Sequence, residues 1–140
     1  KVFYGDGTRI DLLRRAGADS ACAIIFCIDD RDLSAETLTP VRETFPQAML
    51  FVRSYDRAQM LKLMPDRDLH LVRELFESSI ALSVDALASL GDDPEKIAKI
   101  VDEFRKRDAA RLNEQFESGN IRAGSRHSFG VASSDAFTVD

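Results

Sequence analysis

The chain carries an uninterrupted apolar run at residues 21–28, ACAIIFCI, bounded on both sides by polar residues. This run is too short for an ordinary helix and far shorter than the roughly 20 residues needed to cross a bilayer. It is typical of a strand buried on both faces of a parallel sheet. Its cysteines, Cys22 and Cys27, lie an odd number of residues apart, so a strand points them to opposite faces. We therefore expect small buried side chains in a reducing compartment, with neither a disulfide nor a shared metal.

Short apolar runs and helical patterns alternate along most of the chain. An early helix is expected to be capped by Thr8 and to end at Gly17. A second helix is expected at 33–45, which Pro40 either kinks or starts late. The alternation predicts an α/β architecture with parallel strands and right-handed crossovers. The other expected elements are strands at 2–4, 49–52 and 69–72 and helices at 57–64 and 75–90.

The last part of the chain has a different pattern. A charged amphipathic helix is expected at 93–117, because Asp93 fits its N-cap and Pro94 its first position. Residues 118–140 are polar and aperiodic, which predicts a flexible tail, so the α/β part spans 1–92. The helix at 75–90 has two apolar stripes, and the second packs either on the final helix or on another chain. The final helix also carries acid–base pairs four residues apart, at 95/99, 102/106 and 103/107.

Composition and motifs argue against several classes of function. The 140 residues, with 24 acids against 19 lysines and arginines and a net charge of −5, suit one domain that is a poor general binder of nucleic acid. Neither a G-x-S-x-G elbow nor a glycine-rich phosphate loop occurs. His70 and His127 are far apart in the chain, and with two opposed cysteines they form no recognisable zinc or catalytic set. We therefore expect neither an enzyme nor a metal site.

Polar residues gather where the expected strands end, and ligands of open α/β sheets bind beyond the carboxyl ends of the strands. An arginine fork suits a carboxylate or phosphate, and an aspartate can accept from ribose hydroxyls or an amine. A turn with a helix cap, a solvated loop and ordinary surface ion pairs are the plain structural alternatives. The candidates are Asp6 and Thr8 in the turn GDGT, Asp29 and Asp30, Arg53, and Arg73 with Glu74.

The order of these elements matches the later part of a dinucleotide-binding fold. We expect a Rossmann-like parallel sheet that lacks its first strand–helix–strand part, including the glycine-rich loop. In the strand order 3-2-1-4-5-6, loss of strands 1 and 2 separates residues 2–4 from residues 21–28. The chain alone is then expected to be poorly stable, with an exposed sheet edge that recruits another segment or chain.

An ordered set of motifs resembles one known family. KVFYGDGT at 1–8 is followed by DLLR at 11–14, AGA at 16–18, Phe45-Pro46, Val52-Arg53, the RE-x-FESS step at 73–79 and FR-x-x-D at 104–108. This set is similar to the nucleotide-binding RCK (TrkA-N-like) domain of Kef-type glutathione-gated potassium efflux antiporters. The resemblance extends to about residue 112. Arg67 and Leu75 depart from the family pattern, where glycine and threonine are usual.

The resemblance implies a regulatory domain on the cytoplasmic face of the bacterial inner membrane, joined to a membrane antiporter domain in the same polypeptide. It implies a homodimer, an adenine nucleotide (AMP or NAD(H)), glutathione or its adducts as regulatory ligands, and a flavin-containing ancillary subunit. Potassium would leave as protons enter, which protects against electrophiles. The residues that it implies are Asp6, Thr8 and Asp29 for the nucleotide and Arg73, Asp108 and Arg53 for glutathione.

Two other functions stay open on the sequence. The gating subunit of a potassium uptake system has a similar domain, usually followed by a second small α/β domain, whereas a charged helix and a loose tail follow here. A fragment of an NAD-dependent oxidoreductase would need a catalytic acid or base near the nicotinamide, and neither histidine is convincingly placed for that role.

Overall fold

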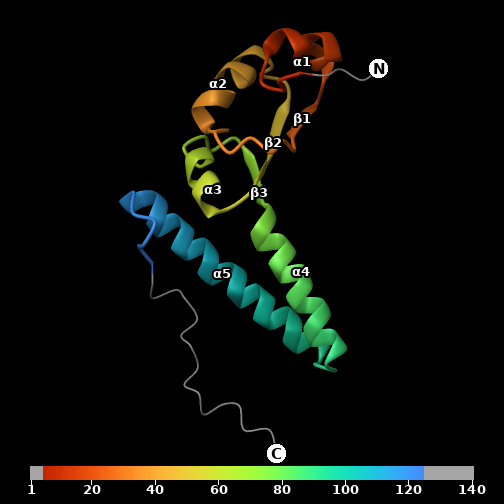
Figure 1. Cartoon of the computed structure of the whole chain (residues 1–140), viewed down its shortest axis with the longest axis vertical. Helices are drawn as coiled ribbons and strands as arrows, with labels where there is room; N and C mark the ends of the chain where they lie inside the picture. The colour runs from red at the N-terminus through yellow and green to blue at the C-terminus, as the bar shows by residue number, and fades with distance from the viewer. Residues whose placement is uncertain (1–4, 125–140) are drawn as a thin grey trace, which may run out of the picture. The chain divides into compact units, whose positions relative to one another are not determined.

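The computed structural model describes residues 5–124 and divides the chain into two compact units, one up to Ser83 and one from Val84 (Figure 1). The boundary lies inside helix α4, Glu74–Ser89, whereas the sequence suggested a boundary at 92/93. The strand expected at 2–4, residue His127 and most of the expected tail lie outside the described residues.

The first unit is built on a three-stranded parallel sheet. Its strands are β1 (Ala23–Phe26), β2 (Met49–Ser54) and β3 (His70–Arg73), in the order β1-β2-β3. Ile25 aligns with Phe51, and Phe51 aligns with His70. The parallel α/β prediction is confirmed, and three consecutive strands side by side match strands 4, 5 and 6 of the Rossmann order.

Helices cover one face of this sheet. Between the strands run α2 (Ala35–Thr44) and α3 (Arg57–Leu63), which lie on the same side, as two crossovers of one hand require (Figure 1). Before β1 come α1 (Ile10–Ala16) and the short 3-10 helix η1 (Ala18–Ser20), and side chains of α1 pack against the same core. The fully buried side chains of this core include Leu33, Leu38, Val41, Phe45, Val52 and Leu63.

The other face of the sheet is largely open, which corrects the expectation of strands buried on both sides. Along β2 exposure alternates: Leu50 is 2% exposed and Met49 is 52% exposed. Ile25 and Val72, on the same face as Met49, are 68% and 54% exposed. The crossover helices shield only the side on which they lie, so the period-two alternation of a half-covered sheet appears.

Both cysteines are free thiols and exposed, so the prediction that they are buried is wrong. β1 is shorter than the apolar run, and Cys22 and Cys27 flank it instead of lying within it.

Helix caps fix most of the element boundaries. Gly17 ends α1 in the left-handed conformation at φ 102°, as predicted. Thr8 does not cap that helix: Arg9 is the N-cap residue, without a side-chain cap. A capping box between Ser34 and Thr37 starts α2 ahead of Pro40, so Pro40 lies inside the helix and does not delay its start.

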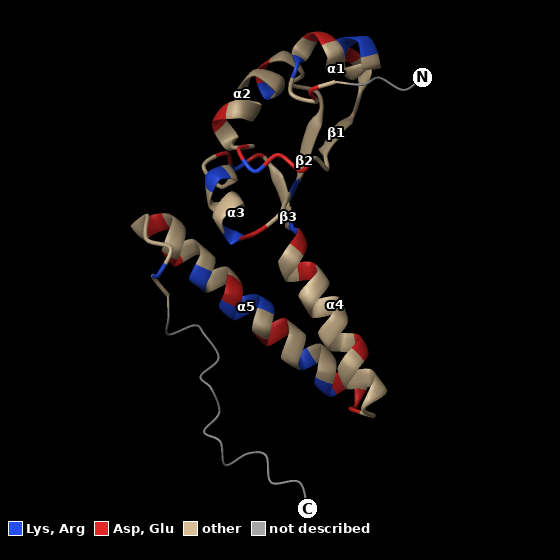
Figure 2. Ribbon diagram, in the orientation of Figure 1, with Lys and Arg blue, Asp and Glu red and all other residues tan. Residues whose placement is uncertain are grey.

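The second unit contains the end of α4 and the long helix α5, Pro94–Ser118. Asp93 caps α5 and Pro94 is its first residue, as predicted. Acidic and basic residues alternate along α5 (Figure 2), and the pairs 102/106 and 103/107 form ion pairs. The buried side-chain amide of Gln115 on α5 donates to the carbonyls of Ile121 and Ala123, which follow the helix end at Gly119. The start of the segment expected to be a flexible tail is therefore held to α5.

A partly buried ion pair joins α2 to the turn before β3. The Asp66 side chain is 4% exposed; its Oδ1 accepts from Arg42 Nη1 at 2.7 Å and from the Asp68 amide at 3.1 Å. Asp66→Ala is expected to lower the free energy of unfolding by about 2 kcal/mol, less than a fully buried pair would cost because Arg42 is 39% exposed. Asp66→Asn keeps an acceptor and should cost about half as much. Urea unfolding of the complete protein measures both, and two wild-type-like variants would contradict this role.

Candidate functional site

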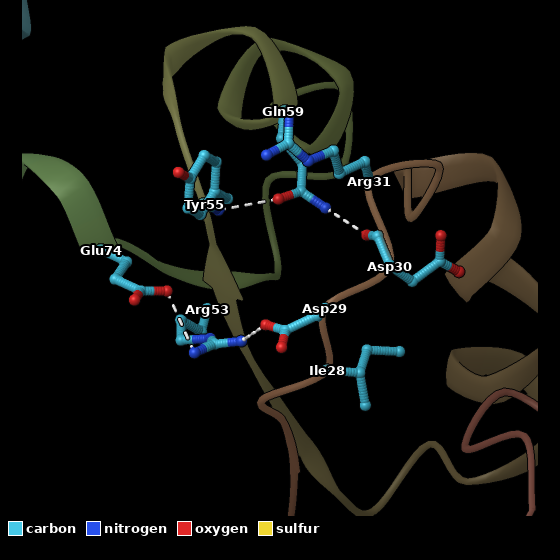
Figure 3. Close-up of a pocket in the computed structure, with 8 residues that line it drawn as sticks. All are labelled: Ile28, Asp29, Asp30, Arg31, Arg53, Tyr55, Gln59 and Glu74. Atoms are coloured by element: carbon cyan, nitrogen blue, oxygen red, sulfur yellow. Dashed lines mark hydrogen bonds and ion pairs between the residues drawn. The ribbon is translucent and has the colours of Figure 1, made fainter.

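A polar pocket of about 420 Å³ lies at the carboxyl edge of the sheet, where the strands end (Figure 3). Its walls come from the loop after β1, the end of β2 with the turn that follows, the first turn of α3 and the first residue of α4. The location is the one that parallel sheets use for ligands. The lining residues are Ile28, Asp29, Asp30, Arg31, Arg53, Tyr55, Gln59 and Glu74.

Arg53 is the central charge of this pocket. It projects from β2 on the open face of the sheet and pairs with Asp29 on one side and with Glu74, at 3.0 Å, on the other (Figure 3). The hydrogen bond to Asp29, with the negative charges of Glu74 and Asp29, raises the pKa of the guanidinium, so it stays charged. Its Nε is buried without a hydrogen-bond partner among the described residues, which leaves a donor for an acceptor oxygen.

A second set of contacts closes the opposite wall. The Gln59 amide bridges the backbone of Tyr55 and Asp30 (Figure 3), and the guanidinium of Arg31 lies 4.6 Å from the Tyr55 ring centroid. Of these residues, only Asp30 was a sequence candidate; Arg31, Tyr55 and Gln59 were not predicted as site residues. The sequence carries only an indirect signal for Gln59. Asp56 is the N-cap of α3 and its side chain accepts from the backbone N–H of Gln59, which places Gln59 in the first turn of the helix.

The residues expected to bind a nucleotide lie in two places. Asp29 lines the pocket, where its side chain is 92% exposed and paired with Arg53. Asp6 and Thr8 form a turn before α1, in which Asp6 accepts from the Thr8 amide at 2.9 Å and from its hydroxyl at 2.7 Å. These two hydrogen bonds lower the pKa of Asp6, so its carboxylate stays ionised.

Two of the residues expected to bind glutathione, Arg53 and Arg73, do not share a pocket. Arg53 is the second-last residue of β2 and Arg73 is the last residue of β3, but they lie on opposite faces, because Arg53 aligns with Val72 while Arg73 aligns with the buried Ser54. Arg73 is 7% exposed, its guanidinium lies 4.2 Å from the Phe76 ring centroid, and it does not line the pocket. Asp108 is half-buried on α5, in the second unit.

Between residues 5 and 124, His, Cys, Asp and Glu side chains make no group of three or more that could hold a metal ion. Within the same part of the chain, every helix is either too short or too polar to span a membrane.

Known proteins resemble this chain along most of its length. The TrkA-N domain family matches residues 1–67. A glutathione-regulated potassium-efflux system protein of Haemophilus influenzae is 37% identical over 85% of the chain, and a KefC protein of Klebsiella pneumoniae is 33% identical over 99% of it. The chain spans only 19% and 22% of these two relatives, about a fifth of their length.

A solved structure agrees with both the sequence and the fold. The C-terminal domain of Kef from Shewanella denitrificans, in an AMP-bound form, superimposes with a TM-score of 0.72 at 32% identity. The match covers 84% of this chain and 74% of that one. The shared fold, the extent of the match and the identity together show that this chain belongs to the Kef family of potassium-efflux proteins, in which it corresponds to the C-terminal domain.

Proposed function

We propose that this chain is the regulatory domain of a glutathione-gated potassium/proton antiporter, joined to its membrane part in one polypeptide. Two observations support the link to a larger protein: the chain spans about a fifth of its relatives, and those relatives are potassium-efflux proteins by name. In this proposal the domain lies at the cytoplasmic face of the membrane and controls potassium efflux coupled to proton entry. It binds ligands and catalyses no reaction.

The observation that carries the proposal is the pocket around Arg53. The Arg53 guanidinium is charged and lies near the end of β2, at the ligand-binding edge of the sheet. Its buried Nε has no acceptor in the described part of the chain. A carboxylate of glutathione or a phosphate of AMP supplies the oxygens that such a donor set binds best. We propose that Arg53 binds the acidic end of a regulatory ligand, and that Arg73 and Asp108 contribute to a glutathione site.

An adenine nucleotide is proposed as a second ligand, since the Kef neighbour is an AMP-bound form. Asp6, Thr8 and Asp29 are the proposed contacts. Asp29 is open to solvent, and Asp6 holds an ionised carboxylate in a fixed turn, so both fit hydroxyl donors such as those of a ribose. The glycine-rich loop that contacts the phosphates in such folds would come from outside these 140 residues.

Assembly with other chains is also proposed. Leu82 and Leu90 of the α4 region are 73% and 82% exposed, and a homodimer in the complete protein would cover such apolar side chains. A flavin-containing ancillary subunit is a further proposed partner. Chemical cross-linking of the complete protein would test both associations.

The decisive experiment measures ion transport and binding in the same preparation. The complete protein is reconstituted in vesicles, and potassium efflux is followed with glutathione and then with a bulky glutathione adduct. We expect glutathione to hold efflux low and the adduct to raise it, while AMP binds in calorimetric titration. Potassium efflux that changes with neither glutathione nor its adduct would contradict the proposal. Potassium uptake in place of efflux would favour the gating subunit of an uptake system.

A further inference from the structure

One buried side chain joins the two loops that form the pocket. Gln59 is only 5% exposed, and both ends of its amide are used. Its Oε1 accepts from the Tyr55 backbone amide at 2.7 Å, and its Nε2 donates to the Asp30 backbone carbonyl at 2.6 Å (Figure 3). A buried amide that is hydrogen-bonded at both its oxygen and its nitrogen holds a single orientation, because each lost bond would leave a buried polar group unpaired.

The joined loops carry the charged side chains of the pocket. Asp29 and Arg31 flank Asp30 in the first loop, and Arg53 precedes Tyr55 by two residues on the strand side of the second. Fixing the Asp30 carbonyl therefore fixes the backbone from which Asp29 and Arg31 project. The distance between the two loops, and with it the width of the pocket, depends on this bridge.

The other contacts between these segments are more exposed than the Gln59 bridge: Arg53, 30% exposed, pairs with Asp29, which is 92% exposed, and the Arg31 guanidinium lies over the ring of Tyr55, which is 37% exposed. Lys62 Nζ lies 3.3 Å from the Arg31 carbonyl and 3.7 Å from Asp32, but its side chain is 52% exposed. Exposed pairs of this kind contribute little to a fixed geometry. Gln59 is held from its own side as well, because its backbone amide donates to the Asp56 cap at 2.9 Å.

We propose that Gln59 is a positioning residue for ligand binding: it holds the acidic loop against the turn after β2 so that Arg53 and its neighbours accept a small anionic ligand bearing a carboxylate or a phosphate. This role rests on the proposed function of the pocket. Gln59 does not touch the ligand's acidic group in this account; it acts through the backbone of Tyr55 and Asp30.

The test uses the complete protein with AMP and with glutathione as probes. Gln59→Met keeps the side-chain size and removes both hydrogen bonds. We expect the amide of Tyr55 to exchange with solvent much faster and the dissociation constant of the bound probe to rise about five- to tenfold. Gln59→Glu keeps the acceptor for the Tyr55 amide but loses the donor to Asp30, so the amide should stay protected while the affinity still falls.

A control separates positioning from general stability. Leu63→Val, in the core of the same helix, should lower the melting temperature and leave the dissociation constants unchanged. The positioning role is overturned if Gln59→Met leaves either the Tyr55 amide exchange or the affinity as in the wild type. If the unmodified protein binds neither probe, or if Arg53→Ala binds as well as the wild type, the proposed function of the pocket fails and the positioning role fails with it.

Discussion

Replacing Arg53 with alanine is expected to weaken binding of glutathione or AMP to the complete protein by about ten- to hundredfold, the range for losing a charge-assisted contact. Arg53 supplies the guanidinium at the centre of the pocket. Without it, the acidic group of the ligand would face the two carboxylates of Asp29 and Glu74. Calorimetric titration at fixed ionic strength measures the change. Efflux should then respond weakly to glutathione at concentrations that gate the wild type.

Two matched variants sharpen this result. Arg14→Ala removes an equally charged side chain that is exposed and paired with Asp19 at 3.4 Å, so it should leave both affinities unchanged. Arg53→Lys keeps the charge but loses the planar fork, and it should recover only part of the affinity. Equal binding by the wild type and Arg53→Ala would remove Arg53 from the site and transfer the glutathione proposal to Arg73.

A second large effect is expected from adjacent residues of β2. Leu50→Lys places a charge on the helix-covered face at a position 2% exposed, and it should cost about 4 kcal/mol or more, enough to unfold a marginal domain. Met49→Lys changes the neighbouring residue on the open face, where the side chain is 52% exposed, and should cost within about 1 kcal/mol. Urea unfolding and protease resistance compare the two.

The pair also reports on what covers the open face in the complete protein. If that face is open there as well, Met49→Lys is tolerated. If Met49→Lys proves as damaging as Leu50→Lys, the expectation of an open face is wrong for the complete protein, and another segment or chain lies on Ile25, Met49 and Val72.

Local sequence signals predicted the elements of the fold well. Apolar runs located β2 and β3, and the Asp93-Pro94 start and Gly17 stop were correct because capping depends only on neighbouring residues. Where two signals competed, the sequence left alternatives open. Pro40 was expected either to kink the second helix or to start it late, and the capping box of Ser34 and Thr37 starts α2 ahead of Pro40.

Burial was harder to predict because it depends on distant parts of the chain. The run at 21–28 is equally apolar at every position, so nothing in it shows that helices cover only one face. Cys22 and Cys27 were expected to be buried for the same reason, and both are exposed.

The site was predicted in part. Strand ends brought Asp29, Arg53 and Glu74 together as expected for a parallel sheet. Arg53 and Arg73 face opposite sides of the sheet because of the register between β2 and β3, which aligns Arg73 with Ser54 and not with Arg53. The sequence could not predict this register, because a run that is apolar at every position fits more than one alignment with its neighbour. Tyr55 and Gln59 were missed because their role is a backbone bridge across 29 residues of sequence.

The junction after the sheet has its own consequence. β3 ends at Arg73 and α4 begins at Glu74, with no residue between them. Each residue of an α-helix advances the chain by about 100° around the axis. One inserted or deleted residue at this point would therefore turn the whole helix by that angle, and Leu82 would point in a different direction from the helix axis. Chain length at this junction is thus a stricter requirement than the identity of the side chains that follow it.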